Sequence, residues 1–227
     1  LSRQAEWTLT RDSSLSVHFT GISYYDSQGV LVLSSAQGQS LKEMAKSRVC
    51  VAVDSDEALR LRDYSDRNLL QLKFVPYESW DRAIKSFGGS CEVISLKLSR
   101  LHGIKQEMKD PQGVKFLGEI IAREPLGPVV RQGDDAWFNI VKWTLFAMIN
   151  AEELGISKDN AEEMKISNRL DIRRFFGLEG NGAKGVGLKS DWAAEIIRQV
   201  GNYGEVFERN LGAGSSLNID RGLNRLW

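Results

Sequence analysis

The stretch Arg48-Val-Cys-Val-Ala-Val53 is followed by a helical pattern over 57–69 and by the apolar run 72–75. A short β-branched run is typical of a buried strand, and apolar residues three or four positions apart are typical of an amphipathic helix. Strand, helix and strand joined by short loops form a crossover that places the two strands parallel in one sheet. This stretch therefore predicts an α/β fold whose parallel sheet is covered by helices on both faces.

The same alternation continues on both sides of this unit, from residue 30 to residue 121. Ser40 with Glu43 three residues later is a capping box, and Ser79 is placed to cap the helix that follows it. Five strands in about ninety residues are enough for a complete small α/β domain. The expected strands are 30–33, 49–53, 72–75, 93–96 and 116–121, and the expected helices are 40–46, 57–69, 80–87 and 99–108.

The rest of the chain has a helical character. A long helix is expected over 134–154, and because it is apolar nearly all round we expect it to be buried on most sides. One or two short helices are expected over 156–176, then a glycine-rich loop over 177–187, then one helix from 190 to 211. No strand is predicted after residue 121, and the first thirty residues hold one or two short strands. These helices therefore lack a sheet of their own.

Composition and charge exclude several classes of function. The 227 residues carry 30 Lys and Arg against 30 Asp and Glu, so the net charge is zero and no nucleic-acid partner is expected. No apolar run approaches the roughly 18 residues that a membrane-spanning helix needs. The chain begins at Leu1 and lacks the pattern of a signal peptide, so we interpret it as a processed form or a fragment.

The residues that carry catalytic or metal chemistry are sparse. Two histidines and two cysteines lie too far apart for a zinc site, and no serine stands in a nucleophile elbow. The glycines of 180–185 match a dinucleotide motif in spacing, but a helix rather than a strand precedes them. We therefore expect no enzyme activity, no cofactor and no metal. Among the six tryptophans, only Trp7 is expected at a cleft.

Cys50 and Cys91 both lie in expected strands. If these strands are neighbours, a disulfide can form, which would place the protein in an oxidising compartment. Two buried free thiols are the alternative, and the spacing does not decide between them.

Two long runs carry a family resemblance that extends over all 227 residues. One is Glu124-Pro-Leu-Gly-Pro-Val-Val-Arg-Gln-Gly-Asp-Asp-Ala-Trp137, and the other is Val200-Gly-Asn-Tyr-Gly-Glu-Val-Phe-Glu-Arg-Asn-Leu-Gly212. Both closely resemble the periplasmic solute-binding receptors of general L-amino-acid ABC transporters, within the family 3 extracellular binding proteins. The resemblance implies an α/β fold of the type II periplasmic-binding-protein class, in which two lobes close on an amino acid.

Mapped onto that family, residues 30–123 correspond to one complete second lobe. Residues 1–29 and 124–227 correspond to a mostly helical part of the first lobe, and the family's opening segment of about a hundred residues is absent. This mapping agrees with the expectation of helices that lack a sheet.

The resemblance also implies a ligand site that departs from the family. Arg11 matches the arginine that holds the ligand carboxylate, with Thr10 and Trp7 beside it. The family's Gly-Thr-Thr loop is replaced by Asp54-Ser55-Asp56, of which Ser55 keeps a hydroxyl. Lys97 stands where the family's Thr-Thr-Asp-x-Ser-Gly run has the aspartate that holds the ligand ammonium. A like charge opposite the ammonium disfavours an ordinary amino acid.

Two functions follow from these observations. The first is a solute-binding receptor, exposed to an extracytoplasmic compartment, that binds an L-amino acid weakly or not at all and works with a membrane permease. The alternative is a receptor-derived, non-enzymatic scaffold subunit of a membrane-associated complex. Its contact would be the apolar helix from Trp137 to Asn150, because an uncovered apolar face seeks a partner.

Overall fold

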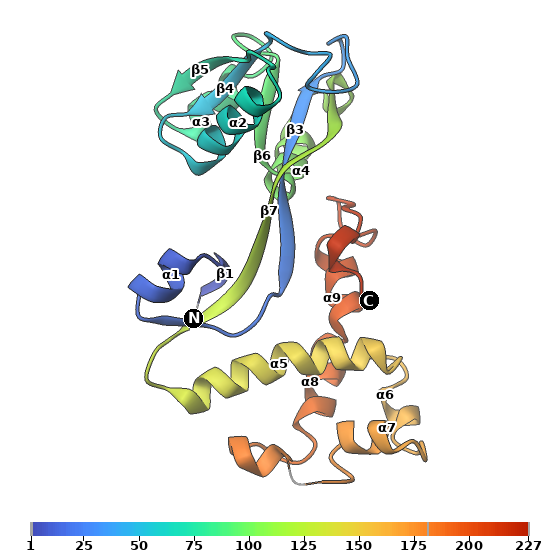
Figure 1. The fold of residues 1–227 in the computed structure, drawn as a ribbon. Helices are drawn as coiled ribbons and strands as arrows, with labels where there is room; N and C mark the ends of the chain where they lie inside the picture. The colour runs from blue at the N-terminus through green and yellow to red at the C-terminus, as the bar shows by residue number, and fades with distance from the viewer. Residues whose placement is uncertain (1, 181, 227) are drawn as a thin grey trace. The chain divides into compact units, whose positions relative to one another are not determined.

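The chain divides into two units, which Figure 1 draws in a computed structural model that describes residues 2–180 and 182–226. Unit 2 is the continuous segment Asp26–Glu124, and unit 1 comprises the described residues of Leu1–Tyr25 and Pro125–Trp227. Two long strands, β3 (Tyr24–Leu33) and β7 (Val114–Arg131), each contain a boundary between the units.

Unit 2 is built on a mixed sheet. Its strands follow the order β7-β3-β6-β4-β5, with β4 (Arg48–Ala52), β5 (Lys73–Tyr77) and β6 (Val93–Lys97) running parallel to one another. β3 runs antiparallel to β6, so the expectation of a wholly parallel sheet is wrong. The reason is the connection from β3 to β4, which has no crossover helix and therefore returns the chain at the same end of the sheet.

Three predicted helices of unit 2 are confirmed, and they cover both faces of the sheet. They are α2 (Asp56–Arg67), α3 (Trp80–Ser86) and α4 (Leu98–Glu107). Alternate strand residues point to opposite faces, so Val49 and Val51 pack with α2 while Cys50 packs with α3 and α4. The two apolar clusters that result hold the strands in place.

The predicted helix over 40–46 is wrong, although its capping contacts form. The Glu43 amide donates to Ser40 Oγ at 3.3 Å, and the Gln39 amide donates to the Glu43 carboxylate at 2.8 Å. The segment is a series of turns, and Lys46 has a φ of 67°, in the left-handed region. A helix cannot continue through that conformation, since the chain turns here to enter β4.

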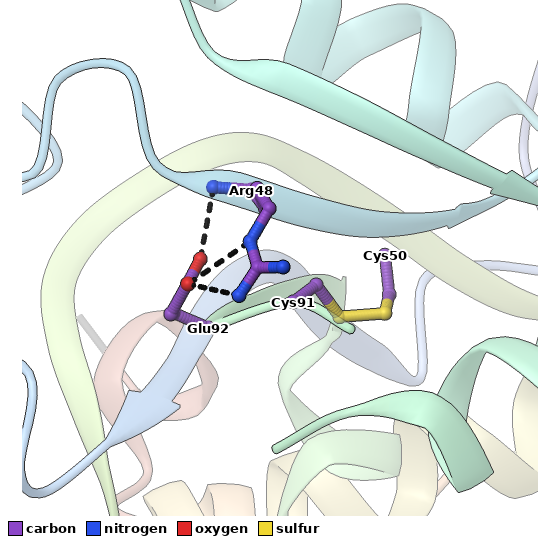
Figure 2. The surroundings of a disulfide bond; sticks show 4 residues. All are labelled: Arg48, Cys50, Cys91 and Glu92. Carbon is purple, nitrogen blue, oxygen red and sulfur yellow. Dashed lines mark hydrogen bonds and ion pairs between the residues drawn. A yellow bond between two sulfur atoms is a disulfide. The ribbon is translucent and has the colours of Figure 1, made fainter. Parts of the chain in front are cut away.

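The structure joins Cys50 and Cys91 in a disulfide, which resolves the question that the spacing left open. Cys50 lies in β4 and Cys91 two residues before β6, with their Cα atoms 5.6 Å apart, and both are buried (Figure 2). Beside them Arg48 donates two side-chain hydrogen bonds to Glu92, and this holds the pKa of that carboxyl below its usual range. The amino ends of β4 and β6 are thus joined covalently and by an ion pair.

The strand β7 extends ten residues beyond the predicted 116–121, so the expectation of no strand after residue 121 is wrong. Its second part pairs antiparallel with β1 (Ser2–Glu6) and β2 (Val17–Phe19) in unit 1. Proline usually interrupts a strand, but here the carbonyls of Pro125 and Pro128 accept hydrogen bonds from the amides of Trp7 and Thr20. Proline lacks only the donor, so a strand can accommodate it where no donor is needed.

The remainder of unit 1 is helical. The long predicted helix is confirmed as α5 (Asp135–Glu153), and the predicted helix over 190–211 is two helices rather than one. Gly201, with a φ of 85°, ends the first, and Asn202 caps the second in a capping box with Glu205. The other elements of unit 1 are α1 (Leu9–Ser14), α6 (Ala161–Met164), α7 (Leu170–Phe175), α8 (Trp192–Val200), α9 (Tyr203–Asn210) and the short 3₁₀ turns Gly182–Val186 and Gly222–Asn224, whereas the 3₁₀ turn Pro111–Gly113 belongs to unit 2.

The expected burial of α5 on most sides is wrong for the described residues. Its buried residues are Leu145, Ala147 and Ala151, of which the two alanines pack with α7 and α8. Three aromatic side chains remain substantially exposed, with 43% for Trp137, 45% for Trp143 and 39% for Phe146. α5 therefore packs against other helices but leaves part of its aromatic surface exposed.

Candidate functional site

Ser55 and Lys97 lie at the same edge of the unit 2 sheet. Lys97 is the last residue of β6, and Ser55 follows the end of β4, which runs parallel to β6. The carboxyl ends of parallel strands are the usual place for ligands in open α/β sheets. Ser55 Oγ accepts the Ala58 amide at 3.2 Å and so caps α2. Two predicted site residues are thus brought to one edge.

The residues that flank Ser55 are both exposed acids. Asp54 has a φ of 55°, a left-handed conformation that glycine adopts without strain, and Asp56 begins α2. Neither carboxylate points into the core, because both residues are exposed. The turn before α2 is therefore held by backbone conformation and by the Ser55 cap, and the carboxylates of Asp54 and Asp56 lie at its surface.

Lys97 belongs to a charged cluster with Arg60 and Glu124. Its ammonium lies 2.7 Å from Glu124 Oε2, and Arg60 Nη1 lies 2.5 Å from Glu124 Oε1. The Glu124 side chain is only 1% exposed, whereas Lys97 keeps 29% and Arg60 30% of their side-chain surface in contact with solvent. One buried carboxylate thus faces two cations.

Sequence reasoning missed two members of this cluster. Arg60 is one of several arginines on a charged helix face, and Glu124 was noted only within the family signature. The cluster joins residues from α2, β6 and β7, so no pattern of neighbouring residues in the sequence predicts it. The replacement of an expected aspartate by Lys97 was the one available signal, because a lysine near a sheet edge needs a counter-charge if it is partly buried.

A buried polar network supports the cluster from β3. Gln28 is fully buried, and its Nε2 donates to the Glu57 carbonyl at 2.8 Å and to Ser95 Oγ at 3.0 Å. Gln28 is also the register partner of Lys97 across the β3–β6 pair. These bonds tie the first turn of α2 to β6, and so they fix the elements that carry Arg60 and Lys97.

Unit 1 brings Trp7, Thr10 and Arg11 together around α1. The Thr8 hydroxyl accepts the Arg11 amide at 3.3 Å and caps the helix, and Thr10 is exposed on it. Arg11 Nη1 donates to the Glu6 carbonyl at 3.1 Å and lies 3.5 Å from the Glu6 carboxylate. The guanidinium keeps 41% of its side-chain surface exposed, so it remains accessible to a carboxylate.

Trp7 has a defined place beside this arginine. Its ring stacks on Phe19 with 5.0 Å between centroids, and 37% of the residue is exposed. The expectation that only Trp7 lies at a cleft is wrong, since Trp143 and Trp192 line a pocket of about 950 Å³ within unit 1. Phe146 and Phe175 also line that pocket, together with the glycine-rich segment before α8.

Metal and membrane features are not found in the described part of the chain. Residues 2–180 and 182–226 contain no cluster of three or more His, Cys, Asp or Glu side chains that could hold a metal ion. Over the same residues, no helix is both long enough and apolar enough to cross a bilayer.

Comparison with known proteins identifies the family. The chain is 45% identical over its whole length to the general L-amino acid-binding periplasmic protein AapJ of Rhizobium johnstonii, and it spans 67% of that protein. It belongs to the family of periplasmic solute-binding proteins of amino-acid ABC transporters. The glutamate/glutamine/aspartate/asparagine-binding protein BztA of Rhodobacter capsulatus is 39% identical over the full chain, which spans 68% of BztA. No protein-family model matches the chain.

A solved structure supports the same family assignment. The periplasmic binding protein of an ABC transporter from Brucella ovis, with glutathione bound, is 40% identical and superposes with a TM-score of 0.89. The match covers 98% of this chain and 71% of that structure. The α/β fold of the type II periplasmic binding proteins is therefore confirmed, and these relatives are binding proteins rather than enzymes.

Proposed function

We propose that this chain is a solute receptor of an ABC transporter in which binding of ordinary L-amino acids is weakened or lost. Residues 30–123 would form its second lobe, and residues 1–29 with 124–227 would form part of its first. Arg11 would hold a ligand carboxylate, with Thr10 and Trp7 beside it and the Ser55 hydroxyl as a further donor. Family membership and the exposed guanidinium of Arg11 support this role.

The observation that carries the proposed weakening is the ion pair between Lys97 and Glu124. An ammonium group needs an acceptor with negative charge, and Glu124 is the buried carboxylate that lies beside Lys97. Both of its oxygens are already within ion-pair distance of a cation, namely Arg60 and Lys97. An incoming ammonium would therefore meet two positive charges around a carboxylate that is already neutralised.

The partner and compartment follow from the family. We place the chain outside the cytoplasm, where it would deliver its solute to a membrane permease. AapJ and the Brucella ovis protein are periplasmic by name, and the Cys50–Cys91 disulfide is consistent with an oxidising compartment.

Calorimetric titration tests this proposal. The chain should give little heat with neutral L-amino acids such as leucine and alanine, and a saturable response to at least one solute in a wider panel of acidic amino acids and organic acids. Micromolar binding of L-leucine would contradict the weakened ammonium site. Silence toward every solute in the panel would contradict the receptor function itself.

A scaffold subunit is the second candidate, and the exposed face of α5 favours it. Trp143 and Phe146, whose ring centroids lie 5.8 Å apart, form an exposed aromatic pair on α5, and Trp137 is exposed nearer the start of the same helix. Saturable binding of any solute in the panel would count against this alternative, because a scaffold needs no ligand.

A further inference from the structure

We propose that the pocket within unit 1 binds a small amphipathic carboxylate, whose apolar body lies between aromatic side chains and whose carboxylate meets exposed lysine and arginine side chains. The pocket has a volume of about 950 Å³, which is the size of a site for a single small molecule. All of its lining residues belong to unit 1. The inference is therefore independent of the solute-receptor role, which uses Arg11 and the residues beside it.

The hollow lies where two helices meet through small side chains. Ala147 on α5 and Ala193 on α8 both line the pocket, and both are buried in the apolar cluster that joins α5, α7 and α8 (Figure 1). An alanine side chain ends at Cβ, so these two positions leave space that a larger side chain would fill. The pocket is thus a hollow in the apolar cluster of unit 1.

Aromatic side chains surround this hollow. Trp143 and Phe146 of α5 pack edge to face with 5.8 Å between their ring centroids, and both remain substantially exposed. Trp192 at the start of α8 and Phe175 of α7 also line the pocket. A ligand with an apolar body would remove this aromatic surface from water, and that burial favours binding.

The glycine-rich stretch supplies the remaining wall. Residues 177–180 and 183–190 contribute lining side chains and backbone. Gly177 has a φ of 69°, and a Cβ added there would collide with the Ser190 carbonyl oxygen. Only glycine permits this close approach, which brings the two ends of the stretch together. The spacing of these glycines resembles a dinucleotide motif, but in the fold they form a wall of an apolar pocket.

The two acids of the lining are neutralised by arginines that do not line the pocket. Asp171 Oδ2 lies 2.6 Å from Arg169 Nη2, and Glu179 Oε1 lies 3.0 Å from Arg173 Nη2. These two carboxylates therefore contribute little net negative charge to the pocket.

The three cations of the lining have no such partner. Arg174, Lys184 and Lys189 are exposed, and none of their side chains forms an ion pair or a hydrogen bond with residues 2–180 or 182–226. A cleft with apolar walls and charges of one sign concentrates ligands of the opposite sign. A carboxylate would accept charge-assisted hydrogen bonds from these groups. A second copy of the chain docked here about a two-fold axis would instead bring like charges together.

Calorimetric titration of the full chain with octanoate, 1-octanol and octylamine at neutral pH is the direct test. The three compounds share an apolar chain and differ in the charge of the head group. Octanoate should bind saturably and at least about tenfold more tightly than 1-octanol, and octylammonium should not bind. Hexanoate, which is shorter by two methylene groups, should bind about tenfold more weakly than octanoate. Equal binding of octanoate and 1-octanol would show only an uncovered apolar surface, and this result or silence toward octanoate would overturn the proposal.

A matched pair of tryptophan variants locates the site. Trp143→Ala should weaken octanoate binding about tenfold, whereas Trp137→Ala should leave it unchanged. Both tryptophans are on α5 and are similarly exposed, but Trp137 does not line the pocket. If both variants bind octanoate equally well, or if Arg11→Met weakens binding instead, the anion lies elsewhere and the proposal fails.

A second pair of variants tests the charge. Lys184→Gln with Lys189→Gln should weaken octanoate binding about tenfold and leave the weaker binding of 1-octanol unchanged, because only the anion uses the ammonium groups. Lys42→Gln with Lys46→Gln removes the same charge from exposed positions of unit 2 and should have no effect on either compound. An equal loss in the two double variants would mean that overall charge attracts the anion, and would overturn the assignment to this pocket.

Discussion

Reducing the Cys50–Cys91 disulfide is expected to destabilise unit 2 by about 4 kcal/mol. The two cysteines are 41 residues apart in sequence, so the bond closes a long loop in the unfolded chain. The loop-closure relation gives an entropy near 13 cal/mol/K for such a loop, or about 4 kcal/mol at 25 °C. This corresponds to a factor of roughly a thousand in the folding equilibrium.

Hydrogen exchange measured with and without a thiol reductant is the assay that locates the effect. The amides of β4 and β6 should lose most of their protection on reduction, because these strands carry or adjoin the two cysteines. The double variant Cys50→Ala with Cys91→Ala is the control, since it has no disulfide and should not respond to the reductant.

Two results would refute this reasoning. One is a loss of less than about 1 kcal/mol in the opening free energy of β4 and β6. The other is an equal response of the double alanine variant, which would show that the reductant acts elsewhere.

Three further predictions concern single side chains. Glu124→Gln should lower unit 2 stability by about 2–4 kcal/mol in urea unfolding, because Lys97 loses its buried counter-charge; a loss equal to that of the exposed-pair variant Glu92→Gln would contradict it. Burial raises the pKa of Tyr203 to about 12, so unit 1 should lose stability between pH 10 and 12, where the unfolded tyrosine ionises and the folded one does not. The stability gap between the unaltered protein and Tyr203→Phe should therefore narrow over that window, and a constant gap would contradict the assignment. Gly127→Ala should lower the melting temperature of unit 1 by several degrees, because the added Cβ would collide with the Gly21 carbonyl; an unchanged melting temperature would contradict that close approach.

The strands and helices of unit 2 were largely predictable because their signals are local. Val49, Cys50 and Val51 form a continuous apolar run, and such a run predicts a strand that is buried on both faces of the sheet. The helix expected over 40–46 failed because its capping residues formed their bonds within turns instead. Capping residues stabilise a helix start, but they do not ensure that a helix follows.

The charged cluster shows what the sequence could not provide. Lys97 was recognised as a departure from the family, and on its own it indicated repulsion of an ammonium group. Its counter-charge on Glu124 lies 27 positions away on another strand, and Arg60 comes from a helix that precedes both. Only the tertiary structure brings these three residues together. It shows that Lys97 is not an isolated unfavourable charge, because Glu124 is its ion-pair partner.

The link between Asn224 and Tyr25 has a consequence for the order of folding. The Asn224 amide accepts the Tyr25 N–H at 2.7 Å and donates to its carbonyl at 3.1 Å, across 199 positions of sequence. Unit 1 therefore cannot complete its contacts until residue 224 has been synthesised. Unit 2 is continuous from Asp26 to Glu124, so it can fold while the rest is still being made or translocated. During that interval the early residues of unit 1 remain without their partners and are exposed to proteases and chaperones.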